Sequence, residues 1–98
     1  MNTATELKTS TETYRIYYDN KAFRWLEEKT GRPFLELNYK SMRDLTVLLW
    51  AGLLRYHPQA TVETADEVLD ALGYEEAMNV VVRAAEQSPP FRQKSAGG

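Results

Sequence analysis

The strongest hydrophobic pattern of the chain lies over residues 41–57 and predicts one long helix. At ~100° per residue, its apolar side chains sweep roughly 250° of a helical wheel and leave a narrow strip at Asp44, Ala51 and Arg55. The apolar arc comprises Met42, Leu45, Val47, Leu48, Leu49, Trp50, Leu53, Leu54 and Tyr56. Because a helix that is apolar on most sides must be buried on most sides, we expect the rest of the chain to pack around it.

Both ends of this central helix carry boundary signals. Ser41 suits the N-cap because its hydroxyl can accept a hydrogen bond from a first-turn N–H, and Asp44 follows at capping-box spacing. Pro58 lacks an N–H and disfavours helical geometry at His57, which places the end of the helix there. Gly52 lies inside the apolar arc, where a helix former would be preferred by about 1 kcal/mol. We therefore expect a neighbouring helix to cross closely at Gly52.

A second amphipathic helix is predicted over residues 20–30. Asp19 suits its N-cap, and Gly31 suits the left-handed position that ends a helix. Its apolar stripe is about 160° wide and comprises Ala22, Phe23, Trp25 and Leu26. One face of this helix should pack against the protein while the other face contacts solvent.

Three further segments are predicted to be helical. Residues 34–39 hold four apolar residues in six and are interpreted as a single turn. Thr64, with Glu67 three residues later, has the spacing of a capping box ahead of a short helix over 65–72. A last helix is predicted over 74–87, with its inner side formed by Ala77, Met78, Val81, Val82, Ala84 and Ala85. Small side chains there would suit tight packing against the glycine of the central helix.

Residues 14–18 are the only stretch with strand-like chemistry, because tyrosine and isoleucine side chains at 14, 16 and 18 alternate with Arg15 and Tyr17. No second strand is evident to pair with it. Two roles stay open for this stretch: an extended segment laid on the helices, or one half of an intermolecular pairing.

The two ends of the chain have little to bury. Residues 1–13 are rich in Thr and Glu, with Leu7 as the one sizeable apolar residue, and predict a flexible N-terminal arm. Residues 89–98 have linker chemistry and predict a flexible C-terminal tail. Residues 14–88 would form the folded domain. The predicted fold class is all-α: a small antiparallel bundle of about four helices around a buried central helix, with flexible termini.

Composition fits one small domain with one core, since the chain has 98 residues. It has no cysteine, and therefore no disulfide, thiolate zinc site or cysteine nucleophile. Its first residues lack the basic and apolar regions of a signal peptide, and the uncharged run from Leu45 to Leu54 is about half a membrane span. We expect a cytoplasmic protein with no membrane partner.

Charge is distributed unevenly around a net charge of −2. Residues 1–55 carry nine basic and seven acidic groups, whereas 56–98 carry three basic and seven acidic groups. An acidic flank repels phosphate. A helix-turn-helix made of 41–57 and 65–72 would have a recognition helix without Arg, Lys, Asn or Gln to read bases. Nucleic acid is therefore not expected as a partner.

Groups that could carry out catalysis are few. His57 is the only histidine, and its place at a helix end before a proline favours a structural role. The carboxylate pairs at 27–28, 66–67 and 75–76 are adjacent in sequence, so their side chains point about 100° apart on a helix. No EF-hand spacing, paired-histidine motif or Gly-rich phosphate loop occurs. We expect no enzyme activity, no metal and no cofactor.

Aromatic residues are more numerous than one thin core needs, and Trp and Tyr are enriched at protein interfaces. Trp25 lies at one edge of its helix's apolar stripe, and Tyr18 extends that edge. Together with Phe34 they form the candidate partner-binding residues, predicted as an exposed aromatic patch that takes an amphipathic helix. The alternative site is the acidic face carried by Asp66, Asp70 and Glu75.

The motif Leu49-Trp-Ala-Gly-Leu53, followed by Pro58, a threonine segment and acidic residues, resembles the small tail assembly chaperone family of long-tailed phages and gene transfer agents. The similarity runs from about Tyr18 to Ala85 and covers roughly two thirds of the chain. It implies a non-enzymatic protein of the host cytoplasm that binds the tape measure protein and keeps it soluble. It also implies contact with tail tube protein during assembly and absence from the mature virion.

Two rival functions stay open. A helical interaction module of another system, such as an adaptor, an antitoxin or a regulatory subunit, would have the same predicted fold and aromatic surface. A small-molecule-binding helical domain would instead use Trp50 and Tyr56 to line a cavity. Self-association is a further open property. A neighbouring gene for a very long, helix-rich protein would favour the chaperone.

Overall fold

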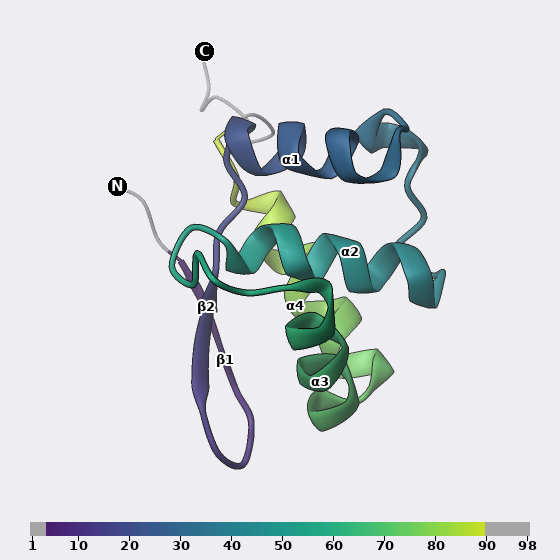
Figure 1. Cartoon of the computed structure of the whole chain (residues 1–98). Helices are drawn as coiled ribbons and strands as arrows, with labels where there is room; N and C mark the ends of the chain where they lie inside the picture. The colour runs from purple at the N-terminus through teal and green to yellow at the C-terminus, as the bar shows by residue number, and fades with distance from the viewer. Residues whose placement is uncertain (1–3, 90–98) are drawn as a thin grey trace, which may run out of the picture.

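The computed structural model describes residues 4–89, which form two strands, four α-helices and one 3-10 turn (Figure 1). The elements are β1 (Thr5–Lys8), β2 (Thr13–Ile16), α1 (Asn20–Thr30), η1 (Phe34–Glu36), α2 (Met42–Leu53), α3 (Val62–Leu72) and α4 (Tyr74–Glu86). Helix α2 lies in the middle, with α1 on one side and α3 and α4 on the other. The hairpin of β1 and β2 lies beside the C-terminal end of α2.

The predicted all-α bundle is wrong, because the N-terminal residues form an antiparallel hairpin. Strand β1 pairs with β2 so that Leu7 lies opposite Tyr14. Leu7 is only 3% exposed and Ile16 is fully buried, so the hairpin contributes to the core. Thr5 and Thr13 fall within the predicted flexible arm over residues 1–13, but they are β-branched and lie in the two strands. The fold is a mixed α/β domain, and the expected arm is wrong for Thr5–Lys8 and for Thr13, which begins β2.

Two hydrogen bonds attach the hairpin and the residue after it to the end of α2 and to His57 beyond it. The N–H of Tyr17 donates to the Gly52 carbonyl at 2.9 Å, and the N–H of Arg15 donates to His57 Nε2 at 3.1 Å. Carbonyls in the last turn of a helix have no partner within the helix. The segment 14–18 is therefore a strand that continues into an extended stretch, and its outer edge satisfies groups at the end of α2.

Gly52 does mark a close approach, but the approaching element is the segment after β2. A Cβ at Gly52 would lie 2.9 Å from Tyr18 Cζ and 3.2 Å from Ile16 Cβ. The prediction that a neighbouring helix crosses there is wrong. The absent side chain makes room for the Tyr18 ring instead.

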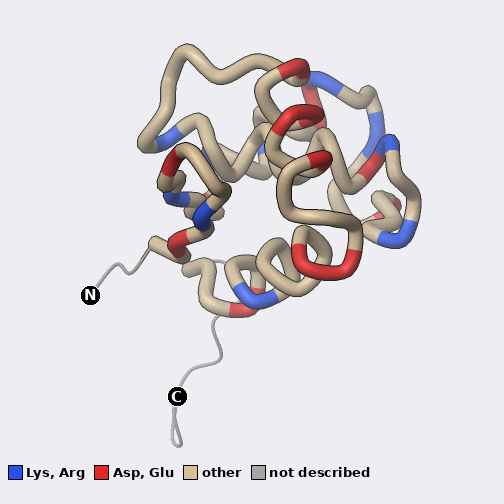
Figure 2. The backbone as a smooth tube through the Cα atoms, turned by 90° about the horizontal axis from the view of Figure 1, so that it is seen from below, with Lys and Arg blue, Asp and Glu red and all other residues tan. Residues whose placement is uncertain are grey.

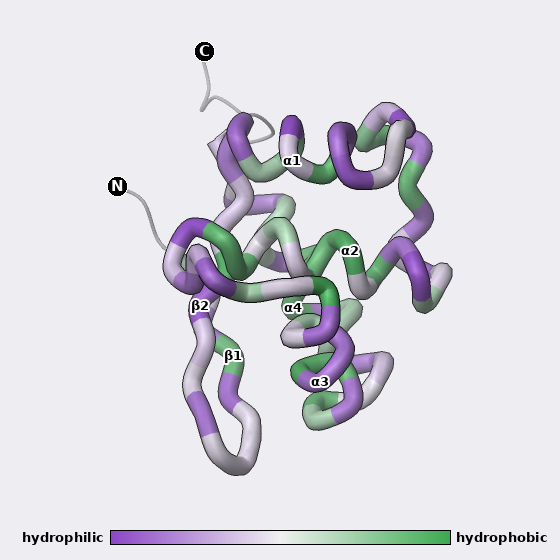
Figure 3. The backbone as a smooth tube through the Cα atoms, viewed as in Figure 1, coloured by the Kyte–Doolittle hydropathy of each residue, from purple (hydrophilic) through white to green (hydrophobic). Residues whose placement is uncertain are grey.

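Helix α2 is buried on nearly all sides, as its hydropathy pattern predicts (Figure 3). Its buried residues are Asp44, Leu45, Thr46, Leu48, Leu49, Ala51, Gly52 and Leu53. The expected polar strip is narrower than predicted, since Asp44 and Ala51 are inside the protein. The partly buried Trp50 donates from Nε1 to the Ala60 carbonyl at 3.2 Å, which fixes the chain beyond α2.

The helix ends at Leu53, four residues before the predicted end at His57. The N–H groups of Leu54 and Tyr56 bond three residues back, to Ala51 and Leu53. Such tightened bonds close a helix with turns. Pro58 therefore follows the end of the helix and does not itself terminate it.

The other helix boundaries follow local chemistry. Helix α1 begins and ends as predicted, with Asp19 accepting from the Ala22 N–H and Gly31 in the left-handed region at φ 71°. Helix α3 begins three residues earlier than predicted, because the capping box is formed by Thr61 and Thr64 and not by Thr64 and Glu67. Helix α4 ends one residue before the predicted position.

Among residues 4–89, no helix is both long and apolar enough to cross a membrane. Apart from Pro89, the predicted C-terminal tail over 89–98 lies outside the described residues.

Candidate functional site

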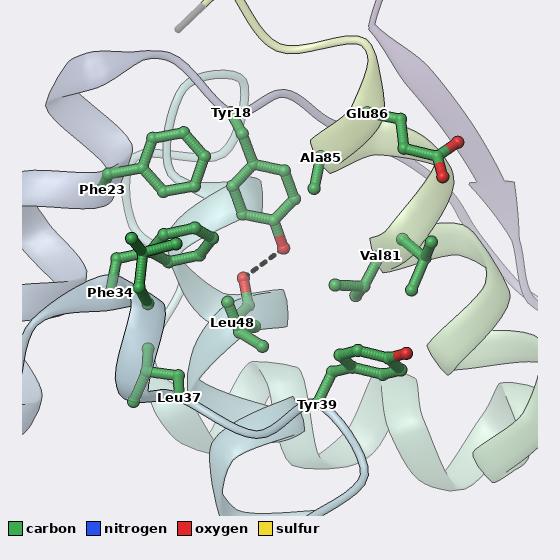
Figure 4. Close-up of a pocket in the computed structure, with 11 residues that line it drawn as sticks. Tyr18, Phe23, Phe34, Leu37, Tyr39, Leu48, Val81, Ala85 and Glu86 are labelled. Carbon is green, nitrogen blue, oxygen red and sulfur yellow. Dashed lines mark hydrogen bonds between the residues drawn. The ribbon is translucent and has the colours of Figure 1, made fainter. Parts of the chain in front are cut away.

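A hollow of about 660 Å³, which we call the apolar groove, opens between the segment 34–39 and α4 (Figure 4). Its lining residues are Tyr18, Phe23, Phe34, Leu35, Leu37, Tyr39, Leu48, Val81, Val82, Ala85 and Glu86. Glu86 is the one charged side chain among these residues. The groove therefore offers mainly carbon surface, contributed by α1, α2, α4, the loop that joins α1 to α2, and Tyr18 in the stretch between β2 and α1.

The floor of the apolar groove is a rigid aromatic stack. The Tyr18 ring lies parallel to Phe23, with centroids 5.6 Å apart, and Phe23 contacts Phe34 at 4.3 Å. The Tyr18 hydroxyl donates to the Leu48 carbonyl, and burial raises the pKa of Tyr18 above its ordinary value. Because this hydroxyl stays protonated and bonded, Tyr18 anchors the floor and cannot serve as a proton donor to a ligand.

One wall of the groove, the 34–39 segment, is fixed by a buried carboxylate. Asp44 accepts from Arg32 Nη2 at 2.6 Å and from the Asn38 N–H at 2.9 Å. The Asn38 N–H, followed by the Arg32 guanidinium, lowers the pKa of Asp44 despite its burial. Glu27 adds a second anchor by accepting from the Phe34 N–H at 2.8 Å. The wall is thus preformed and needs no partner to shape it.

The rim of the groove leaves large apolar groups in solvent. Leu35 is 82% exposed and Tyr39 is 40% exposed. A shallower hollow of about 450 Å³ shares Tyr39, Val82 and Glu86 with the groove and adds Glu76, Met78, Asn79 and Arg83. An apolar centre therefore continues into a rim that carries charges of both signs along α4.

Two of the three predicted partner-binding residues line this groove, but not as an exposed patch. Tyr18 is fully buried, so the expectation that it stays at an exposed edge is wrong. It precedes α1 and does not follow that helix's wheel. Phe34 is half-buried in the groove wall.

Trp25 is half-buried against the core and is not a lining residue. It lies two positions after Phe23, about 200° around α1, so both cannot face the groove. The predicted grouping of Tyr18, Trp25 and Phe34 is not formed.

The sequence interpretation missed Leu35, Tyr39 and Val82. A signal was available, because residues 34–39 hold four apolar residues in six and one short turn cannot bury all of them. The structure buries none of η1 fully. This excess of apolar groups in one turn, and not the edge of the α1 stripe, indicates the exposed apolar surface.

Two other candidate features are His57, which has a structural role, and the acidic side chains of α3, which do not gather into a site. His57 accepts from the Arg15 N–H and makes an edge contact with Tyr14 at 5.3 Å between centroids. The acidic side chains of α3 are exposed and can be followed as bands in Figure 2. Over the described part of the chain, no three His, Asp or Glu side chains gather closely enough to hold a metal ion.

The fold and the groove define the class: a small mixed α/β domain with an apolar groove whose wall is fixed by hydrogen bonds within the domain. Comparisons of the chain with family models, with curated proteins and with solved structures find no match.

Proposed function

We propose that this protein is a non-enzymatic binding protein whose apolar groove takes an amphipathic helix of a longer partner. The observation that carries the proposal is the exposed apolar rim. Leu35 and Tyr39 remain in solvent although a preformed apolar groove lies directly beside them. Exposed apolar groups around a concave surface mark interaction sites, and helix-in-groove recognition buries such groups under a partner's apolar face.

The charges around the groove set the register of the partner helix. Glu86 lies at the groove, and Glu76 and Arg83 border the adjoining hollow. An apolar stripe at i, i+3, i+4 and i+7 would enter the groove, while polar groups on its flanks would meet these side chains. We therefore propose an amphipathic helix as the partner.

The particular function that we propose is phage tail assembly chaperone. The partner would be the tape measure protein, held in the host cytoplasm while tail tube subunits assemble, and the chaperone would be absent from the mature virion. Support comes from the family resemblance of the Leu49–Leu53 motif. A tape measure protein is long and helix-rich, so it presents many helices of the kind that the apolar groove fits.

A capture experiment tests both levels of this proposal. The chain is co-expressed with the tape measure protein of its own genome and purified through a tag on the chain. Tyr39→Ala and Leu35→Asp alter exposed groove residues, so both variants should fold. We expect each to capture at least tenfold less tape measure protein.

Tyr56→Ala is the matched control, because Tyr56 is also 40% exposed and does not line the apolar groove. Unchanged capture by the groove variants would overturn the groove as the binding site. Absence of tape measure protein from the parent purification would overturn the chaperone function. In that case, amphipathic helical peptides titrated against labelled chain would still report whether the groove binds helices.

A further inference from the structure

The two edges of the hairpin differ in how their backbone groups are satisfied. The N–H group of Arg15 on β2 and that of Tyr17 just after β2 point away from β1. The first donates to His57, which follows α2, and the second donates to the Gly52 carbonyl in the last turn of α2. The register places Glu6 opposite Arg15 and Lys8 opposite Thr13. In an antiparallel pair of strands, two directly opposed residues either exchange backbone hydrogen bonds with each other or both point their N–H and C=O groups away from the partner strand. The N–H and C=O groups of Glu6 and Lys8 therefore point away from β2.

This outer edge of β1 has no partner among residues 4–89, where no backbone hydrogen bond beyond the hairpin involves Glu6 or Lys8. Both residues are exposed, while Leu7 between them faces the core. An unpaired strand edge is a template for pairing with another chain. The hairpin projects beside the helices in Figure 1, and α4 packs against β1, yet the side chains of Glu6 and Lys8 stay exposed to solvent.

We propose that β1 pairs antiparallel with β1 of a second copy of this chain, around a twofold axis at Leu7. This pairing places Glu6 of each copy opposite Lys8 of the other. All four residues present outward backbone groups, so they would form two hydrogen-bonded pairs. The result is a four-stranded sheet in the order β2, β1, β1, β2.

Charge selects this register over its neighbours. Sliding the strands by two residues in one direction puts Glu6 opposite Glu6, and in the other direction it puts Lys8 opposite Lys8. Like charges directly opposite each other destabilise a strand pair, whereas opposite charges stabilise it. Of these three registers, only the one centred on Leu7 places a glutamate opposite a lysine at both of its charged pairs.

The pairing should be weak. Each β1 strand has four residues, and two such strands bury less than the ~1,200 Å² of a standard stable interface. We expect a dimer that dissociates on dilution, with a dissociation constant in the micromolar to millimolar range. This inference does not depend on the apolar groove or on its partner, because the contacts lie at β1 and not at the groove.

Sedimentation equilibrium of the full chain from about 10 μM to about 1 mM tests the proposal directly. We expect the average mass to rise from monomer toward dimer. Amide hydrogen exchange at Glu6 and Lys8 should slow as concentration rises. The Arg15 amide, which is already bonded to His57, should show no concentration dependence and serves as the internal control.

Charge reversal provides the matched variants. Lys8→Glu places two carboxylates opposite each other at both pairs and should weaken association on the order of tenfold. Glu6→Lys places two ammonium groups there and should do the same, although it also removes the exposed ion pair with Arg15 at 3.8 Å. An equimolar mixture of the two variants should associate as well as the parent, since opposite charges meet again.

A monomer throughout the concentration range would overturn the proposal. So would association that is as strong in Lys8→Glu as in the parent, or association of the parent that leaves amide exchange at Glu6 and Lys8 unchanged. Thermal melts of each variant at low concentration confirm that the monomer is folded.

Discussion

Gly52 should reverse the usual ranking of helix residues. Alanine is normally preferred over glycine within a helix by about 1 kcal/mol. Here a Cβ would meet the Tyr18 ring at 2.9 Å, and that ring is held by the Leu48 carbonyl and by stacking on Phe23. We expect Gly52→Ala to lower the free energy of unfolding by about 1–3 kcal/mol in urea denaturation, as overpacking does. A variant as stable as the parent would show that Tyr18 moves aside freely.

Asp44 makes stability depend on pH at the acid end. Its folded-state pKa lies below the ordinary value, first because the Asn38 N–H bonds to the carboxylate and then because of Arg32. As pH falls, the unfolded chain therefore binds the proton before the folded protein does, and stability is lost. The contribution of Asp44 is complete above about pH 4 and declines as pH falls through the lowered pKa.

Asp44→Asn should consequently cost about 1–3 kcal/mol at neutral pH, because the Arg32 hydrogen bond loses its charged partner in a buried site. The difference between parent and variant should shrink as pH is lowered toward about 2. Urea denaturation at several pH values measures both effects. A difference that stays constant down to the lowest pH would contradict the assignment of the pH dependence to Asp44.

At the scale of elements, β1 should be a stabilising part of the fold. Leu7→Ala removes a side chain that is 3% exposed and should lower the free energy of unfolding by about 2–4 kcal/mol. Lys8→Ala on the same strand changes an exposed residue. It should alter the free energy of unfolding by less than about 0.5 kcal/mol. Denaturation at low protein concentration separates these effects from self-association. Equal, small effects of both changes would mean that the hairpin is not part of the cooperative unit.

Elements with local signals were predictable from the sequence, whereas elements fixed by distant contacts were not. Asp19, Gly31 and Ser41 act within one turn of their own helix, and the structure confirms these caps. The end of α2 depends on Tyr17, which is far away in sequence and bonds to the Gly52 carbonyl. Strand β1 was missed because four residues with one apolar side chain carry almost no periodicity of their own.

At the scale of the whole molecule, the buried central helix was predictable and the candidate site was only partly so. Phe34 could be identified from its apolar segment, and the structure places it in the groove wall. Tyr18 was misplaced because its environment is set by the space at Gly52 and the acceptor at Leu48, both in another element. A helical wheel describes one helix, whereas the groove is formed by five segments that meet only in the folded chain.

The bond from Arg15 to His57 also has a consequence for synthesis on the ribosome. It joins residues 42 positions apart. At about 5–20 residues per second, a ribosome needs roughly 2–8 seconds to add the residues between them. A two-stranded hairpin alone is marginally stable and forms within microseconds, so it would open and close many times during that interval. Strand β1 leaves the exit tunnel before α2 but is fixed only after α2 has followed it, and Leu7 waits exposed during that interval.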